Sequence, residues 1–281
     1  MTQAASSTPL ESGSVIYLYG VARGAGITPP EEGIVPGATV ELLPVGDLVA
    51  VLSRTPGDAF APGGDGASGG DAWTIERVLA HHRVLTSIAP QCTVAPMKFG
   101  AVCHDLPDVV ELLTRGGAQF KLALDRVADA SEWSIKLYAD MDVCRAITEQ
   151  APAIAPLKAE LAEASPGKAF FIRKKLRDAV EHEVRRRVAA RAECVHDELT
   201  AGAREAASAR QRQQPGKTRD GRTLMLIAGT AYLVEKQGEE RFRQTVTHLT
   251  ETLSAEGVLL ELTGPWPPYS FASLNADIQR G

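Results

Sequence analysis

The stretch SVIYLYGVARG, residues 14–24, decides how the fold must be layered. Val15, Tyr17 and Tyr19 alternate with Ile16 and Leu18, so one extended segment presents apolar side chains on both of its faces. A strand of this kind is stable only when other elements cover both faces. The sequence therefore predicts a sheet enclosed between layers, rather than a sheet with one face in water.

Two further stretches predict strands of the same sheet. Residues 38–45 and 47–55 are rich in Val and Leu and are joined through Gly46, which predicts a β-hairpin. Residues 93–104 (TVAPMKFGAVCH) are expected to be extended, with Pro96 at an edge, a bulge or a strand end, because proline cannot donate to a ladder. The first half of the chain is thus expected to hold a small mixed sheet with helices.

A helix is expected at residues 73–90 (WTIERVLAHHRVLTSIAP), where the large apolar residues recur at near-helical spacing. We expect this apolar set to face the sheet: Ile75, Val78, Leu79, Val84, Leu85 and Ile88. The Gly-rich residues 61–71 before it lack the Gly-Lys-Ser/Thr ending of a phosphate-binding loop, and we interpret them as a flexible connection.

The second half of the chain alternates strands with helices. Residues 131–140 and 258–265 predict strands at its two ends, and TLMLIAGTAYLVEK (223–236) predicts a buried strand between them. The longest helical pattern runs from Lys168 to about Arg212, and Gly202 could bend or end it. Its apolar residues step by four, which predicts one buried face on a helix longer than its own domain requires; they are Ile172, Leu176, Val180, Val184 and Val188.

This order predicts an α+β fold with two domains, a small N-terminal mixed sheet with helices and a ferredoxin-like C-terminal domain with a long helix. We expect a disordered leader at 1–13, an N-terminal domain at 14–130, a C-terminal domain at 131–264, and a Pro/aromatic tail at 265–281. Composition fits a globular protein, since 44% of the 281 residues are hydrophobic and 23% are charged.

Charge and hydropathy argue against two classes of partner. The formal net charge is −5, which gives no reason to expect nucleic-acid binding. No apolar run approaches the roughly 18 residues of a membrane-spanning helix, so no lipid membrane is expected. The four cysteines form no Cys-x-x-Cys pair and are interpreted as free thiols.

The spacing of the candidate histidines and cysteines does not fit a catalytic pair or a metal site. His81 and His82 are adjacent on a helix and point about 100° apart, so they cannot chelate one metal in the usual way. His182 and His196 lie about four helical turns apart. Cys103 and His104 occupy neighbouring extended positions that face opposite sides. We therefore predict no catalytic residue, no metal and no cofactor.

Two basic clusters lie on the long helix, RKKLR at 173–177 and RRRVAAR at 185–191. One interpretation is a solvated face supported by ion pairs along the helix. The other is a charged face for an acidic protein partner, formed by Arg185, Arg186, Arg187 and Arg191. Nucleic acid is disfavoured here as well, because no stacking aromatics lie among these arginines.

The segment LTGPWPPYSF, residues 262–271, holds three prolines and three aromatics in a chain that is 5% aromatic. Neither Pro265 nor Pro267 can donate to a ladder, so the last strand is expected to end near Gly264. Pro267 and Pro268 then fix an extended path. We expect Trp266 to be mostly buried against its own domain. Tyr269 or Phe271 is expected nearer the surface, available to a partner.

Seven stretches in order resemble the gas vesicle protein F and L family, over residues 15–273. They are YLYGVARG, LVAVLS, HHRVLTSIAPQCTVAPMKFGAVCHD, SEWSIKLYAD, GKAFFIRKKL, AGTAYLVEK and LELTGPWPPYSF. The family's extended motif often carries Leu-Pro-x-Arg-Phe-Gly. Here APMKFG has Pro96, Phe99 and Gly100 in place but Lys98 where the family has arginine, which keeps the charge and loses the planar fork.

The resemblance implies a non-enzymatic, minor component of the cytoplasmic gas vesicle that is needed for assembly. Its implied partners are the major gas vesicle shell protein, which is small and very apolar, and other gas vesicle assembly proteins. Its implied work is to bind the shell protein and limit its aggregation during nucleation. Two alternatives stay open from the residues: a small-molecule enzyme or ligand-binding module on a ferredoxin-like sheet, and a cytosolic chaperone that does not remain in the vesicle.

Overall fold

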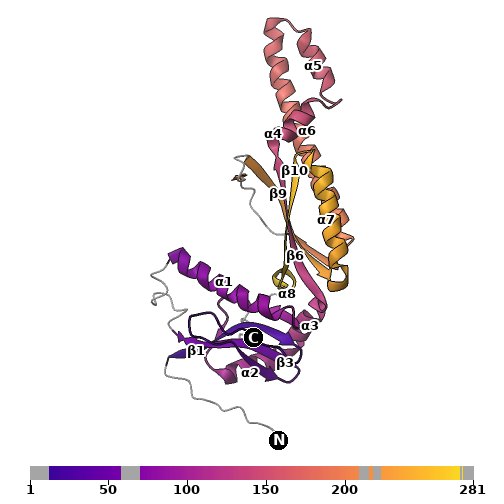
Figure 1. Ribbon diagram of the computed structural model, residues 1–281. Helices are drawn as coiled ribbons and strands as arrows, with labels where there is room; N and C mark the ends of the chain where they lie inside the picture. Colours follow the sequence, from indigo (N-terminus) through magenta and orange to yellow (C-terminus); the bar gives the residue numbers. More distant parts are fainter. Residues whose placement is uncertain (1–12, 58–69, 209–214, 218–222, 273, 275–281) are drawn as a thin grey trace. The chain divides into compact units, whose positions relative to one another are not determined.

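The computed structural model describes residues 13–57, 70–208, 215–217, 223–272 and 274, in two compact units (Figure 1). The described residues up to Ser131 and those from Trp266 onward form the first unit, and Glu132–Pro265 form the second. The two predicted domains meet at nearly this point, with the residues after the last strand grouped with the first unit. Most of the predicted leader and of the Gly-rich connection lie outside the described residues.

The first unit is built on an antiparallel sheet with strand order β2-β3-β1-β4, in which β5 also pairs with β1. Its strands are β1 (Ser14–Arg23), β2 (Glu41–Val45), β3 (Leu48–Pro56), β4 (Thr93–Pro96) and β5 (Val102–Cys103). The β2–β3 pair confirms the hairpin, with Val45 opposite Leu48 across the turn. Residues 16–19 of β1 are fully buried, which confirms that both faces of this strand are covered.

Helices cover both sides of this sheet (Figure 1). They are α1 (Gly70–Ile88), α2 (Leu106–Arg115), α3 (Gly117–Val127) and the short α8 (Tyr269–Ala272). Val84, Leu85 and Ile88 of α1 pack against a core that includes Tyr17 and Tyr19 of β1.

The predicted inward-facing set is wrong for the first half of α1. Ile75, Val78 and Leu79 are 56%, 43% and 51% exposed. The helix begins its contact with the core cluster only at Ala80, so the turns before Ala80 carry apolar side chains that no described residue covers fully. At about 100° per residue, Ile75 and Leu79 lie nearly opposite Val84 and Ile88 around the helix, so the predicted apolar set does not share one face.

The second unit holds a sheet with strand order β10-β6-β9-β7, and β8 also pairs with β9. The strands are β6 (Ala130–Asp140), β7 (Glu205–Ser208), β8 (Pro215–Lys217), β9 (Thr223–Glu235) and β10 (Val258–Trp266). Leaving β8 aside, the chain runs strand, helices, two strands, helix, strand, and the spatial order is fourth, first, third, second. This is the ferredoxin-like arrangement that the sequence predicted.

The helices of this unit are α4 (Met141–Glu149), α5 (Ala155–Ala162), α6 (Pro166–Thr200) and α7 (Glu239–Ser254), with a 3₁₀ turn at Lys236–Gly238. The 35 residues of α6 span about 52 Å. Val195 and Leu199 near its C-terminal end join the sheet core together with α7. Val180 and Val184 pack instead on a second core with Cys144 and Ile154. The first half of α6 runs beside α5, away from the sheet of this unit (Figure 1).

Two predicted boundaries in this unit are wrong. The long helix ends at Thr200 rather than near Arg212, because Arg204 donates its backbone N–H to Leu233 and residues 205–208 pair with β9. Pairing with a neighbouring strand therefore overrides the helical propensity of the alanines there. The last strand also continues past Gly264 to Trp266. It is an edge strand, where the missing N–H of Pro265 leaves no ladder bond unmade on the open side.

Candidate functional site

The C-terminal segment and the APMKFG motif meet in the first unit, although about 170 residues separate them in sequence. Lys98 donates its backbone N–H to the carbonyl of Leu274, and Leu274 donates its own to the carbonyl of Pro96, each at 2.9 Å. Between Trp266 and Leu274, Pro267 and Pro268 are buried. The prolines therefore lead the chain back over its own core, and the two motifs hold each other in place.

A buried polar and aromatic cluster lies beneath this junction. The backbone N–H of Gly100 donates to the Tyr17 hydroxyl at 3.3 Å, and the same hydroxyl is hydrogen-bonded to Nδ1 of His81 at 2.8 Å. The Phe99 ring lies edge-on to both Tyr17 and His81. Burial lowers the pKa of His81 to about 4, with a smaller contribution from His82, so this imidazole is neutral near pH 7.

Gly100 and Gly264 each occupy a backbone conformation that other residues adopt at a cost. The φ angle of Gly100 is 88°, where a side chain would strain the turn that delivers its N–H to Tyr17. The φ angle of Gly264 is 127°, and a Cβ there would lie 2.9 Å from the carbonyl oxygen of Glu132. Both motif glycines are therefore explained by local geometry.

The aromatics of the C-terminal segment do not divide as predicted. Trp266 is only half-buried and its ring lies 5.1 Å from that of His82. Tyr269 is also half-buried, and its hydroxyl is 3.1 Å from Nδ1 of His82. Of the two residues expected nearer the surface, Tyr269 or Phe271, Phe271 is only 4% exposed. It is buried because α8 turns it toward α3, where Arg126 lies over its ring and donates to its carbonyl at 2.9 Å.

Two of the four arginines in the predicted face of α6 are paired with carboxylates of the same unit. Arg186 forms a two-pronged pair with Glu183, one turn earlier. Arg191 forms another with Glu256, with both N–O distances at 2.8 Å. These pairs fit the interpretation of a face supported by ion pairs at Arg186 and Arg191. Arg185 is exposed and Arg187 half-buried, and no ion pair among the described residues involves either.

The surroundings of Cys103 do not favour a nucleophilic thiol. Burial raises the pKa of the Cys103 thiol to about 11, with help from Asp108 and Asp105, whereas a nucleophilic cysteine needs a lowered pKa. Within the described ranges, no three side chains among His, Cys, Asp and Glu gather to hold a metal ion. No helix in the same ranges is long and apolar enough to span a bilayer.

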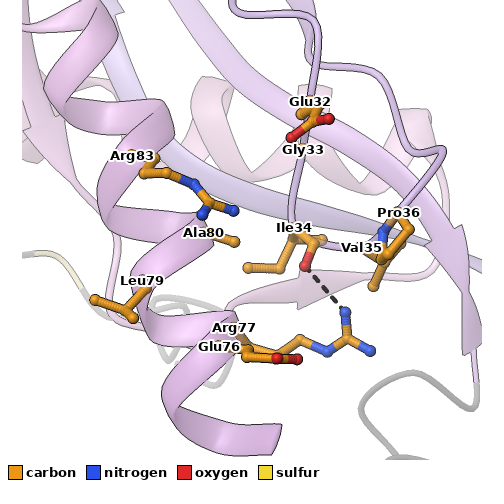
Figure 2. Close-up of a pocket in the computed structure, with 10 residues that line it drawn as sticks. All are labelled: Glu32, Gly33, Ile34, Val35, Pro36, Glu76, Arg77, Leu79, Ala80 and Arg83. Atoms are coloured by element: carbon orange, nitrogen blue, oxygen red, sulfur yellow. Dashed lines mark hydrogen bonds between the residues drawn. The ribbon is translucent and has the colours of Figure 1, made fainter.

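The first unit carries a surface cavity of about 270 Å³ beside α1 (Figure 2). Glu76, Arg77, Leu79, Ala80 and Arg83 line it from the helix, and residues 32–36 line it from the connection before β2. Arg77 crosses to the carbonyl of Ile34 at 3.0 Å, as Figure 2 shows. The lining mixes charged and apolar groups, with no set of convergent acids and bases.

The exposed aliphatic side chains of Ile75, Val78 and Leu79 lie next to this cavity, and we call them the α1 apolar face. Their i, i+3, i+4 spacing places them on one side of the helix. Leu79 belongs both to this face and to the cavity lining. The α1 apolar face was visible in the sequence as helical periodicity, but its exposure was not.

Comparison with known proteins gives a consistent result. The family model described as gas vesicle synthesis protein GvpL/GvpF matches residues 15–273. Gas vesicle protein L from Streptomyces sp. (strain CB03234) is 30% identical over 266 residues, covering 92% of each chain. Gas vesicle protein F from the same strain is 26% identical over 259 residues, covering 91% of this chain and 98% of the relative.

Solved structures agree on the fold. The crystal structure of GvpF from Anabaena sp. PCC7120 matches with a TM-score of 0.65 at 19% identity, covering 93% of this chain and 97% of that one. GvpF from Microcystis aeruginosa matches with a TM-score of 0.58 at 19% identity, covering 92% and 99%. Because the family model matches residues 15–273 and so spans both units, this chain belongs to the gas vesicle synthesis protein GvpL/GvpF family.

Proposed function

We propose that this chain acts in gas vesicle assembly by binding the apolar shell protein and limiting its aggregation while a vesicle nucleates. Membership in the GvpL/GvpF family supports an assembly role and interaction with other gas vesicle proteins. The proposal adds two specific points to this family role. The partner is the shell protein, and the contact protects the shell protein from aggregation.

The observation that carries the proposal is the α1 apolar face. Three large aliphatic side chains, each about half-exposed, stand together on one helix of the first unit. Isolated exposed apolar residues are ordinary, but a contiguous group beside a cavity is typical of a binding surface. Covering the exposed half of one such side chain would stabilise a complex by about 1 kcal/mol, so each of the three adds a contribution of this size. An apolar shell protein has the matching chemistry.

The charged groups around this face suit the edge of a protein interface. Glu32, Glu76, Arg77 and Arg83 line the adjacent cavity and form a polar border to the apolar contact. Interfaces commonly combine an apolar centre with a polar rim.

Arg185 of the predicted partner-binding set is retained as a second contact. It is exposed on α6 in the second unit. We propose that Arg185, with the side of α6 next to it, contacts an acidic partner protein of the vesicle. The role is non-catalytic and uses no cofactor, in keeping with the raised pKa of Cys103 and the neutral, hydrogen-bonded His81.

Co-expression with the shell protein tests the proposal. The variant Ile75→Gln, Val78→Gln, Leu79→Gln removes the α1 apolar face while keeping good helix formers. Its matched control, Val110→Gln with Leu122→Gln, removes exposed aliphatic side chains from α2 and α3 of the same unit. We expect the wild type and the control to keep shell protein in the supernatant after centrifugation, and the triple variant to leave it in the pellet.

Equal supernatant levels with the wild type and the triple variant would remove the α1 apolar face from the proposal. A second measurement addresses where the chain works. We propose that it remains with the gas vesicle, so purified vesicles washed in high salt should retain it. Complete loss on washing, with shell protein still protected in the co-expression assay, would instead identify a chaperone that leaves before the vesicle is complete.

A further inference from the structure

The first turns of α6 carry two phenylalanines in water. Phe170 and Phe171 are 67% and 72% exposed, and their rings contact each other edge-to-face with centroids 5.6 Å apart. On the opposite side of the same turns, Ala169 and Ile172 are buried. The helix is therefore packed on its inner side, and its most apolar side chains point outward.

Basic side chains surround this aromatic pair. Lys174 follows Phe170 by four residues and Lys175 follows Phe171 by four, so each lysine lies one turn from a ring on the same outward side. Arg177 lies seven residues from Phe170 and continues the line. We call the five residues Phe170, Phe171, Lys174, Lys175 and Arg177 the aromatic-basic stripe.

The basic residues of this part of the helix form no ion pairs with other described residues. Residues 166–177 contain five basic residues and no Asp or Glu, and the first acidic residues to follow are Asp178 and Glu181. None of the five takes part in an ion pair within the described residues, in contrast to Arg145, Arg186 and Arg191 of the same unit. The unpaired positive charge of the long helix is therefore concentrated in its first half, beside the two rings.

This arrangement does not serve the stability of the helix. The N-terminus of a helix is the positive end of its dipole, where acidic side chains stabilise and basic ones destabilise. The first turn of α6 has no acidic residue, includes Lys168, and its N-cap residue Ser165 forms no side-chain cap bond. Exposed phenylalanines add no core packing either. The stripe fits a role in binding better than a role in folding.

We propose that the aromatic-basic stripe is a docking surface for an acidic amphipathic helix of a partner protein. Such a helix would lay apolar side chains over Phe170 and Phe171 and place carboxylates beside Lys174, Lys175 and Arg177. The stripe runs along one face of one helix, and two helices packed side by side match such a line of contacts. Charge complementarity would orient the partner and speed association.

A protein helix fits better than an extended polyanion. The whole chain has a formal net charge of −5, so a nucleic acid or an anionic membrane would be attracted by the stripe and repelled by much of the remaining surface. A single acidic helix needs only the stripe. The proposal is independent of the shell-protein contact, because the α1 apolar face belongs to the first unit and the stripe to the second.

Fluorescence anisotropy with a designed peptide tests the proposal on the full chain. The probe is a labelled peptide of about 20 residues with Leu at i, i+3, i+4 and i+7 and Glu at most other positions. A scrambled peptide of the same composition has the same charge but no apolar face. At about 50 mM salt, where charges are weakly screened, we expect the patterned peptide to bind at least roughly tenfold more tightly than the scrambled one.

Two variants separate the two halves of the stripe. Phe170→Ser with Phe171→Ser should weaken binding of the patterned peptide about tenfold or more at low and at high salt. Lys174→Glu with Lys175→Glu should weaken it chiefly at low salt and reduce the salt dependence. The charge-matched control is Lys236→Glu with Arg241→Glu, on exposed positions of the same unit, and should bind as the wild type does.

Three results would overturn the proposal. The first is equal binding of the patterned and scrambled peptides by the wild type, or unchanged binding by both stripe variants. The second is binding to vesicles of anionic phospholipid, lost in the stripe variants, with no binding of the patterned peptide; the occupant would then be a membrane surface. The third is a wild-type dimer in sedimentation that becomes monomeric in Phe170→Ser/Phe171→Ser, because a second copy would then cover the stripe.

Discussion

The hydroxyl of Tyr17 and Nδ1 of His81 lie 2.8 Å apart in the interior of the first unit. Gly100 donates its backbone N–H to the same hydroxyl, so the opening strand, α1 and the APMKFG motif share one hydrogen-bonded junction. Burial lowers the pKa of His81 and so keeps it neutral, and the junction ties three of the family's motifs to the core.

The neutral His81 predicts a loss of stability in mild acid. Its pKa is lowered to about 4 in the folded chain, from an unfolded value near 6.5, so the unfolded state binds a proton first as the pH falls. The contribution of this group is complete above about pH 6.5 and declines through pH 4, by roughly 3 kcal/mol in total. Urea unfolding across this range measures it.

The comparison that isolates His81 uses His81→Leu, with the exposed His248→Gln as control. Carboxylates titrate in the same range, so the slope of unfolding free energy against pH must be compared between proteins. We expect a shallower slope in His81→Leu and an unchanged slope in His248→Gln. Identical slopes in all three proteins would mean that His81 protonates without cost in the folded state.

Phe271 is predicted to be a stability residue. It is buried between α8 and α3, so Phe271→Ala should lower the free energy of unfolding by about 3–5 kcal/mol. Tyr269→Phe removes only the hydroxyl beside His82 and should cost about 1 kcal/mol or less. Calorimetric or urea unfolding compares the stability of the two variants. An unchanged melting temperature in Phe271→Ala would show that Phe271 is not buried in solution.

Arg191 and Glu256 are predicted to be energetically coupled, and Arg185 is not part of that pair. A double-mutant cycle with Arg191→Gln and Glu256→Gln should give a coupling of up to about 1 kcal/mol, because both groups are partly exposed. The coupling should shrink at high salt. Arg185→Glu should leave stability unchanged. Zero coupling at low salt would show that the pair is solvated in solution.

Gly100 occupies a backbone conformation that alanine would adopt only with strain. Its positive φ makes Gly100→Ala destabilising by about 1–2 kcal/mol, with loss of the N–H contact to Tyr17 adding to this. Gly167→Ala is the control, because Gly167 lies in the first turn of α6 with nothing within 4 Å of a Cβ, and there alanine should be neutral or stabilising. Equal effects of the two substitutions would contradict the strained turn.

The layered first sheet and the ferredoxin-like second sheet followed from local pattern. Residues 16–19 are apolar on both faces, and the structure covers both faces of this strand. In the second unit, strands separated by helices allowed few alternative strand orders within one sheet. The predicted end of α6 near Arg212, beyond its actual end at Thr200, shows the limit of such patterns. Residues 205–208 carry alanines that suit a helix, and only the presence of β9 makes them a strand.

The contacts around the candidate surfaces depended on tertiary structure. Nothing local to residues 266–274 indicates that Leu274 pairs beside Met97, or that α8 buries Phe271. Periodicity placed Ile75, Val78 and Leu79 together on one side of the helix, but Val84, Leu85 and Ile88 meet the core from a different side. The neutralising carboxylate of Arg191 comes from Glu256, 65 residues further along the chain.

Light scattering by shell protein diluted out of denaturant measures whether the α1 apolar face limits the aggregation of the shell protein. With the purified wild-type chain present in equimolar amount, we expect scattering to stay low. We expect the same with Val110→Gln/Leu122→Gln, and a rapid rise in scattering with Ile75→Gln/Val78→Gln/Leu79→Gln. Unchanged aggregation with the wild-type chain, or equal protection by the triple variant, would contradict a shell-protein contact at the α1 apolar face.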